Sequence, residues 1–319
     1  MNLLNTEQAA AFLRGCSDVH ILIHRSPDGD CIGSGYALYA VLRAMGIRAR
    51  VCCDDPIPPM YRFLTEDAAF EDFEPQTVIA VDVADLQLLG GLREQYEGRI
   101  DLCIDHHISN TGYAKSNYWN PEASAACEVL YALFKAMQLT LTEQIAMCLY
   151  TGMATDTGCF KFSNAGAETF AAVADLKRSF DLPYASLNRL LFDVKSKGRM
   201  ALDARLMQSV RMSADDRVAL LYLPYAWMEE LKVSSDETDG VSNLPLQIAG
   251  VEIGILVKEQ SEGGYRVSMR AGDHADVSAI CRQFGGGGHV KAGGCSIAEG
   301  QSDAVCNMLM AAAEATLQS

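Results

Sequence analysis

The stretch that decides the fold is VHILIHRSPDGDCIGSG, residues 19–35. It opens with an apolar run at residues 19–23, which has the length of a buried strand. A Pro-Asp-Gly-Asp turn then leads into a run of helical length at residues 32–45. The same alternation continues with strand-like runs at 47–53, 77–81 and 100–104, and helix-like runs at 123–137, 142–155 and 167–179. This order predicts right-handed βαβ units and a largely parallel, Rossmann-like α/β sheet.

The pattern changes after Asp181-Leu182-Pro183. Residues 187–210 look helical and basic, and strand-like runs follow at 218–223, 250–258 and 265–270, the last two joined by a Gly263-Gly264 turn. These runs predict a smaller, mixed α/β domain. We therefore expect three parts: an N-terminal domain at 1–185, a helical linker at 186–215 and a C-terminal domain at 216–319.

Composition narrows the class of protein. The 319 residues suit about two domains, and the formal charge of −15 disfavours binding to long duplex nucleic acid, which depends on neutralising phosphates. No stretch of 18 residues lacks a charged side chain, and the N-terminus shows no signal-peptide pattern, so we expect no membrane span. The eleven scattered cysteines, without a C-x-x-C motif, are typical of the reducing cytoplasm.

Acidic and histidine side chains recur at the ends of the predicted elements. His24 to Asp30 follow the first strand, Asp82 follows the run at 77–81, and Asp105-His106-His107 follow the run at 100–104. Asp156 stands at the end of a helical run. The carboxyl ends of parallel strands form the ligand-binding edge of an open α/β sheet, so we expect these groups to gather there.

Crowded carboxylates repel one another, and a bound cation would relieve that repulsion. Carboxylate oxygens with some imidazole suit Mn²⁺ or a similar octahedral ion better than structural zinc. The five aspartates and up to three histidines exceed the needs of one ion, and a pair of ions about 3.5–4 Å apart would use them. An aspartate at a strand end, taken alone, is usually a turn or helix N-cap residue. Only the combination of sites favours metal binding.

As a set, these motifs resemble those of the DHH phosphoesterases, which are named for an Asp-His-His triplet. The matching segments are HRSPDGDCIGS, IAVDVAD, IDHH and ATDTGCFKFSN. The resemblance implies two Mn²⁺ ions, one held by His24 and Asp28 and bridged by Asp82 to the other. It implies that the second ion is held by Asp30, His106 and Asp156. It also implies that Asp105 supports the histidines and that His107 faces the scissile phosphate.

A glycine run, FGGGGHVKAGG at residues 284–294, is the second strong signal. Its backbone N–H groups can approach an anion closely, helped by the dipole of a following helix or turn, and the segment 241–298 around it is neutral, with five basic and five acidic residues. A tight turn or flexible linker would use the same glycines. The run resembles the GGGH motif of the DHHA1 domain, which accompanies DHH domains. That resemblance implies that the nucleotide end of the substrate is held by Arg270, Gly285, Gly286, Gly287, Gly288 and His289.

The segment 238–245, together with 250–253, looks most like the nano-RNase branch of this family. The resemblance then implies a cytoplasmic, homodimeric hydrolase that uses a two-metal mechanism on nanoRNA, dinucleotides such as pApA, and 3′-phosphoadenosine 5′-phosphate (pAp). Four alternatives stay open. They are a cyclic-dinucleotide phosphodiesterase, a single-strand exonuclease, a family II pyrophosphatase and a non-catalytic nucleotide sensor. The exonucleases carry an OB-type domain for which we expect no room, the pyrophosphatases have a lysine-rich C-terminal motif, and the best-known cyclic-dinucleotide enzymes are membrane-anchored.

Overall fold

The computed structural model describes residues 2–238 and 240–318 and divides into two compact units, Met1–Val194 and Lys195–Ser319. Asp239, which falls in the segment 238–245 discussed above, lies outside the described residues. Among the residues that are described, no helix combines the length and the apolar character needed to cross a membrane.

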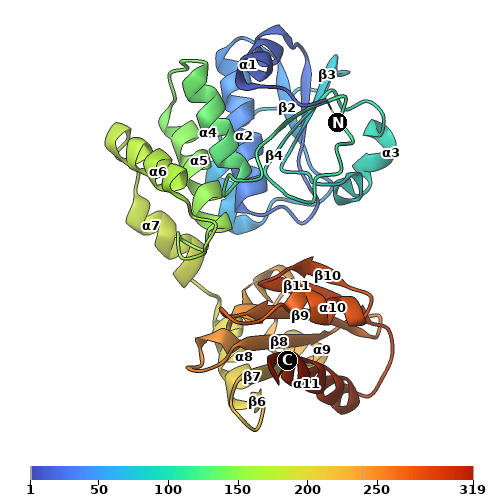
Figure 1. Ribbon diagram of the computed structural model, residues 1–319. Coiled ribbons are helices and arrows are strands. Elements are labelled where there is room, and N and C mark those ends of the chain that lie inside the picture. Colours follow the sequence, from blue (N-terminus) through green and yellow to red (C-terminus); the bar gives the residue numbers. More distant parts are fainter. Residues whose placement is uncertain (1, 239, 319) are drawn as a thin grey trace. The chain divides into compact units, whose positions relative to one another are not determined.

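The N-terminal unit, coloured blue to yellow-green in Figure 1, is built on a five-stranded sheet in the order β2-β1-β3-β4-β5. Every neighbouring pair in it is parallel, as the alternating sequence predicts. Its elements, in chain order, are α1 (Thr6–Gly15), β1 (Val19–Leu22), α2 (Gly29–Ala44), β2 (Ala49–Cys52), η1 (Pro59–Leu64), β3 (Thr77–Val81), η2 (Leu86–Leu89), α3 (Leu92–Tyr96), β4 (Leu102–Asp105), β5 (Ser116–Trp119), α4 (Ala126–Ala136), α5 (Glu143–Asp156), α6 (Ala167–Ser179), α7 (Tyr184–Asn188) and the π-helical turn η3 (Arg189–Asp193).

Both faces of this sheet are covered, which explains why its strands are apolar runs without alternation. Ile21 and Ile79 belong to the core shared with α2, α4 and α5, whereas Leu22 and Ala80 belong to a smaller core with η2 and α3. Successive side chains therefore serve opposite cores. Most of the strand residues are therefore apolar, and most acidic and histidine groups of the predicted site lie at or after the strand ends.

The C-terminal unit, yellow to red in Figure 1, contains a six-stranded mixed sheet in the order β10-β11-β9-β8-β7-β6. Only β7 and β8 run parallel among its paired strands. Its elements are α8 (Lys197–Gln208), β6 (Arg211–Met212), β7 (Val218–Leu223), α9 (Tyr225–Leu231), η4 (Asp236–Thr238), η5 (Val241–Asn243), η6 (Pro245–Gln247), β8 (Ile253–Glu259), β9 (Tyr265–Ala271), α10 (Val277–Gln283), β10 (Gly287–His289), β11 (Ala292–Ile297) and α11 (Ser302–Gln318).

Two separate cores cover this second sheet. Val267 and Met269 pack in the core that includes residues of α10 and α11, while Leu221 and Leu256 pack in the core that includes residues of α8 and α9. The helix predicted at 187–210 is interrupted, because α7 and η3 end at Asp193 and α8 begins only at Lys197, after its N-cap Ser196. The mixed α/β character of the domain is confirmed.

Candidate metal and phosphate site

Three side chains reach the site from the carboxyl ends of β1 and β3. His24 stands two residues beyond β1. Asp28 caps the N-terminus of α2, and its Oδ1 accepts the backbone N–H groups of Asp30 and Cys31. Asp82 follows β3 directly and has a φ of 59°. A non-glycine residue in this left-handed region is strained, and such strain is concentrated at functional sites.

A second group comes from β4 and from the helices. Asp30 lies in the first turn of α2 with no exposed surface. Its two carboxylate oxygens accept the backbone N–H groups of Ala126 and Cys127, at 2.6 and 2.9 Å, in the first turn of α4. The N-terminal ends of two helices therefore stabilise its negative charge. His106 follows β4, and Asp156 is the last residue of α5.

Asp82 lies between the two histidines. Its Oδ2 is 3.6 Å from Nε2 of His24, which is also 3.8 Å from Oδ1 of Asp28. Its Oδ1 is 3.5 Å from Nε2 of His106, and that nitrogen is 3.3 Å from Asp156 and 3.9 Å from Asp30. The structure thus brings together all six residues that the sequence suggested as ligands, with one oxygen of Asp82 facing each group.

The ionisation of this cluster shows how crowded it is. Burial, together with the charge of Asp82, raises the pKa of Asp28 to about 6 and that of Asp30 well above its usual range. Burial acts in the same direction on Asp82, but contacts with His106 and His24 hold its pKa well below the ordinary value. Bound cations would relieve the repulsion among these carboxylates.

Among the described residues, two buried atoms of this cluster have no hydrogen-bond partner, namely Asp82 Oδ1 and His106 Nε2. Such orphaned polar atoms are costly, and a metal ion would satisfy both. Cys31 also lies within reach of His24 and Asp82. Burial raises the pKa of its thiol well above the usual value, so giving up the proton to bind a metal is costly for Cys31. The donor set that fits a metal is therefore carboxylate and imidazole.

Asp105 is fully buried and positions the second histidine of the triplet. Its Oδ1 accepts the backbone N–H of His106 at 2.8 Å and lies 2.8 Å from Nδ1 of His107. Its Oδ2 accepts the side-chain amide of Asn110 at 2.5 Å. Burial alone would lower the pKa of His107, but the contact with Asp105 and the charge of Asp82 raise it overall.

Three neighbours fix these loops by contacts that the sequence did not predict. Asn110 is one. Trp119, at the end of β5, donates its indole N–H to the carbonyl of His107 at 2.8 Å, so its indole N–H anchors the site loop. Asn164 donates to the carbonyl oxygens of Ser124 and Asp156. Strand β5 itself was missed too, because Ser-Asn-Tyr-Trp carries no apolar run.

In the C-terminal unit, Arg270 and His289 lie in one row across the sheet. Arg270 on β9 pairs with Ala292 on β11, which in turn pairs with His289 on β10. Residues directly opposite one another on neighbouring strands project from the same face. Burial lowers the pKa of the Arg270 guanidinium, and no carboxylate of the described residues pairs with it. This row can hold an anion.

The glycine run forms a turn and the short strand β10 rather than a loop before a helix. Gly285 has a φ of +74° and Gly288 one of +137°, both unfavourable for other residues. A Cβ on Gly286 would lie 2.1 Å from the carbonyl oxygen of Gly294, whereas one on Gly287 would meet nothing within 4 Å. Lys291 donates to the backbone carbonyls of Gly272 and Asp273, so its ammonium anchors a loop.

Comparison with protein families agrees with the order of these two units. Residues 18–153 match the model described as the N-terminal domain of the DHH family, and residues 215–316 match the DHHA1 domain. The chain belongs to the DHH/DHHA1 family of phosphoesterases. The DHH match contains five of the six clustered residues and ends before Asp156; the DHHA1 match contains the Arg270 row.

Curated relatives place the chain within one branch of this DHH/DHHA1 family. It is 29% identical over 88% of its length to "Bifunctional oligoribonuclease and PAP phosphatase NrnA" of Thermus thermophilus, covering 84% of that protein. It is 25% identical to the Bacillus subtilis protein of the same name, over 87% of this chain and 89% of that one. An exopolyphosphatase-related protein from Bacteroides fragilis shares the fold, with a TM-score of 0.88 at 22% identity over 98% of this chain and 96% of the other.

Proposed function

We propose that this chain is a hydrolase that cleaves short oligonucleotides, including nanoRNA and dinucleotides such as pApA, and removes the 3′-phosphate of pAp. The observation that carries the proposal is the position of Asp82, whose two oxygens face His24 on one side and His106 on the other. The names of the relatives, oligoribonuclease and PAP phosphatase, support the substrate class.

We propose two Mn²⁺ ions as the cofactors. One would be held by His24, Asp28 and Asp82, and the other by Asp82 and the residues Asp30, His106 and Asp156. When bound, such a pair polarises phosphate oxygens and lowers the pKa of a water molecule between the ions. The orphaned atoms of Asp82 and His106 support this arrangement.

The side chains divide the remaining work. Because Asp105 engages Nδ1 of His107, the other ring nitrogen, Nε2, is left to face the substrate. In the proposed hydrolysis, water attacks phosphorus, the P–O3′ bond breaks, and His107 gives a proton to the leaving oxygen. Arg270, the 285–288 backbone and His289 would hold the nucleotide end, since Arg270 is a half-buried cation and the backbone from Gly287 to His289 is at least partly exposed.

The proposed setting is the cytoplasm. All eleven cysteines are free, although some lie near one another. Free thiols support a reducing compartment. The charge of −15 disfavours long nucleic acids, so short anionic substrates suit the chain better. We also propose a homodimer, which light scattering of the purified protein would test.

One experiment ranks the candidate substrates. The protein with Mn²⁺ is incubated with RNA from dinucleotides to chains of about twenty residues, and with pAp, pApA and cyclic di-AMP. We expect the highest kcat/KM for pAp and the shortest RNAs, and no reaction with Asp82→Ala. Preference for the longest RNA would favour an exonuclease, and preference for cyclic di-AMP a cyclic-dinucleotide phosphodiesterase. Metal binding without any hydrolysis would indicate a sensor.

A further inference from the structure

The sheet face that carries Arg270 continues along β9 to a second cation, Arg266. Side chains two and four residues apart on a strand point to the same face, so Ser268 and Arg266 share the face of Arg270. Arg266 pairs with Ser296 on one side and with Lys258 on the other. Four steps of about 3.3 Å place Arg266 roughly 13 Å from Arg270 along the strand.

The stretch between the two arginines offers little obstruction on its β11 side. There Ser268 pairs with Gly294, and Gly294 pairs with Gly287, whereas on the β8 side Ser268 pairs with the buried Leu256. Arg266 and Ser296 are exposed, while Ser268 and Gly294 are half-buried. An extended chain could therefore lie on this face and contact both arginines. The separation between the two arginines is too long for one nucleotide, because the backbone of a nucleotide repeats every six bonds. It suits two nucleotide steps.

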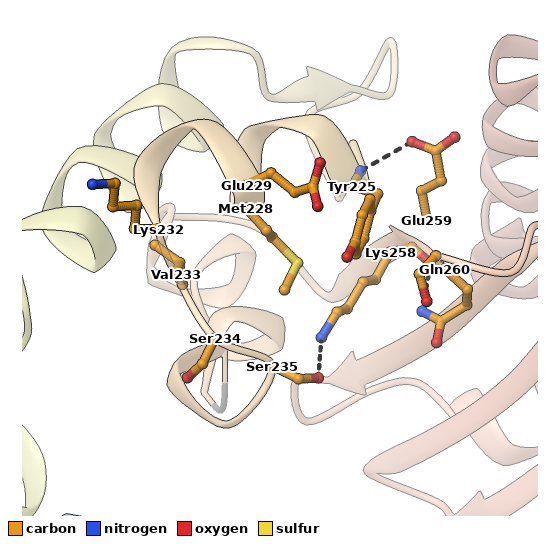
Figure 2. Close-up of a pocket in the computed structure, with 11 residues that line it drawn as sticks. Tyr225, Met228, Glu229, Lys232, Val233, Ser234, Ser235, Lys258, Glu259 and Gln260 are labelled. Atoms are coloured by element: carbon orange, nitrogen blue, oxygen red, sulfur yellow. Dashed lines mark hydrogen bonds between the residues drawn. The ribbon is translucent and has the colours of Figure 1, made fainter.

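A cavity of about 530 Å³ is lined by Lys258, the cross-strand partner of Arg266. Figure 2 shows Tyr225 and Met228 of α9 and the side chain of Lys258 around it, with Gln260 at its edge. An aromatic ring, a thioether and an amide are the groups that recognise a nucleobase, by stacking and by hydrogen bonds to its edge. The volume is in the range of small-ligand sites.

The walls of this cavity are fixed in place. Lys258 donates to the hydroxyls of Ser235 and Thr238, both at 2.9 Å, and Figure 2 shows its ammonium directed at Ser235. Glu259 accepts the backbone N–H of Tyr225 at 3.0 Å. A preorganised pocket loses little entropy when it binds a ligand.

The charged residues indicate where the base and the phosphate of a nucleotide would lie. Glu229 lines the cavity and would repel a phosphate there, but it can accept from the amino group of a base. Lys258 on β8 and Arg266 on β9 are cross-strand partners, and two like charges in such a pair repel each other. A phosphate beside Arg266 would relieve that repulsion.

We propose that Arg266 and the cavity formed by Tyr225, Met228, Lys258 and Gln260 are a second nucleotide subsite. It takes the phosphate and base of a nucleotide two steps away from the one held in the Arg270 row. The subsite rests on the proposed function and extends it, since it acts only on substrates of three or more nucleotides. A free mononucleotide has the same chemistry and is the competing occupant.

Length-dependent kinetics test the subsite. We expect Arg266→Gln to lower kcat/KM for tri- and tetranucleotides roughly tenfold, as for loss of a charge-assisted hydrogen bond. In a plot of log KM against log salt concentration, the slope for these substrates should decrease by about one unit. Tyr225→Leu should lower the same values roughly fivefold or more by removing base stacking. For both variants pAp and dinucleotide hydrolysis should stay unchanged.

A matched control is Arg282→Gln, an exposed arginine on α10 of the same unit. This variant should leave kcat/KM unchanged for every substrate. Equal losses at every length, or no loss at any length, would overturn the subsite while leaving pAp hydrolysis intact. A fluorescent trinucleotide with non-hydrolysable linkages, bound to wild type and to Arg266→Gln, keeps the test independent of turnover: equal affinities would also overturn it. If AMP alone alters pAp hydrolysis in the wild type but not in Arg266→Gln, the occupant is a free nucleotide and the assignment to substrate is wrong.

Discussion

The Nδ1 atom of His107 lies 2.8 Å from Oδ1 of Asp105, a carboxylate with no exposed surface. The other oxygen of Asp105 accepts the amide of Asn110. A buried carboxylate engaged on both sides has one stable orientation, and His107 inherits that orientation. Proton transfer to a leaving oxygen requires a fixed donor, so this contact connects the fold to the proposed chemistry.

Asn110→Asp separates the two tasks of Asn110. The new carboxylate can still accept the backbone N–H of Gly112, as Asn110 does now, but it would repel Asp105. We expect kcat for bis-p-nitrophenyl phosphate to fall roughly 10- to 150-fold, the effect of losing a hydrogen bond to a charged group, with KM nearly unchanged. Tyr113→Phe is the control, because it removes a hydrogen bond of the same loop to Val83. Equal kcat in both variants would show that the amide contact with Asp105 is unimportant.

Asp82→Ala and His24→Ala should differ in their metal content. Asp82 faces both histidines, so its loss should reduce both proposed sites, whereas His24→Ala should weaken mainly the site shared with Asp28. Metal analysis after dialysis measures this directly. Two full equivalents in Asp82→Ala would contradict the bridging role. EDTA should abolish wild-type activity, and Mn²⁺ should restore it better than Zn²⁺ does.

Metal affinity should rise with pH. Burial alone would lower the pKa of His24, but its contact with Asp82 and the charge of Asp28 raise it to about 9 in the metal-free cluster. The pKa of His106 is raised as well, chiefly by Asp156 and Asp82 against the effect of burial. Both rings therefore carry a proton at neutral pH that a metal must displace. Between about pH 6 and pH 9 the Mn²⁺ association constant should increase, with proton release seen by calorimetry in buffers of different ionisation enthalpy. A flat profile would show that the histidines are neutral before the metal binds.

Much of the site could be predicted because its residues are adjacent in sequence to strand ends. The runs before His24, Asp82 and Asp105 are apolar on both faces, and that pattern indicates buried parallel strands. The contacts that orient these groups could not be predicted. Asp30 accepts from Ala126, 96 residues away, and nothing local in either segment encodes that meeting.

The glycine run shows a second limit. Close packing of strands and close approach of an anion both require the absence of a Cβ, so the sequence cannot separate them. The structure does separate them, since Gly286 is packed against β11 and Gly287 borders open space.

Gly286→Ala and Gly287→Ala therefore make a matched pair. A methyl group on Gly286 would collide with the carbonyl of Gly294 and with Cys295, so this variant should lower the melting temperature of the protein. On Gly287 a methyl group meets no protein atom and should leave the melting temperature unchanged.

If an anion approaches the open face at Gly287, the same methyl group lies in its path. Gly287 pairs with Gly294, in the row next to the one that joins Arg270 and His289. Gly287→Ala should then raise KM for pAp, as Arg270→Ala should by removing a charge-assisted contact worth roughly a factor of 10 to 150 in affinity.

Both variants should retain bound metal and the hydrolysis of bis-p-nitrophenyl phosphate, which has no nucleotide end, whereas His107→Ala should lose that activity. An unchanged KM for pAp in Gly287→Ala, Arg270→Ala and His289→Ala would mean that the run only shapes a turn, because no group of this row would then contact the substrate.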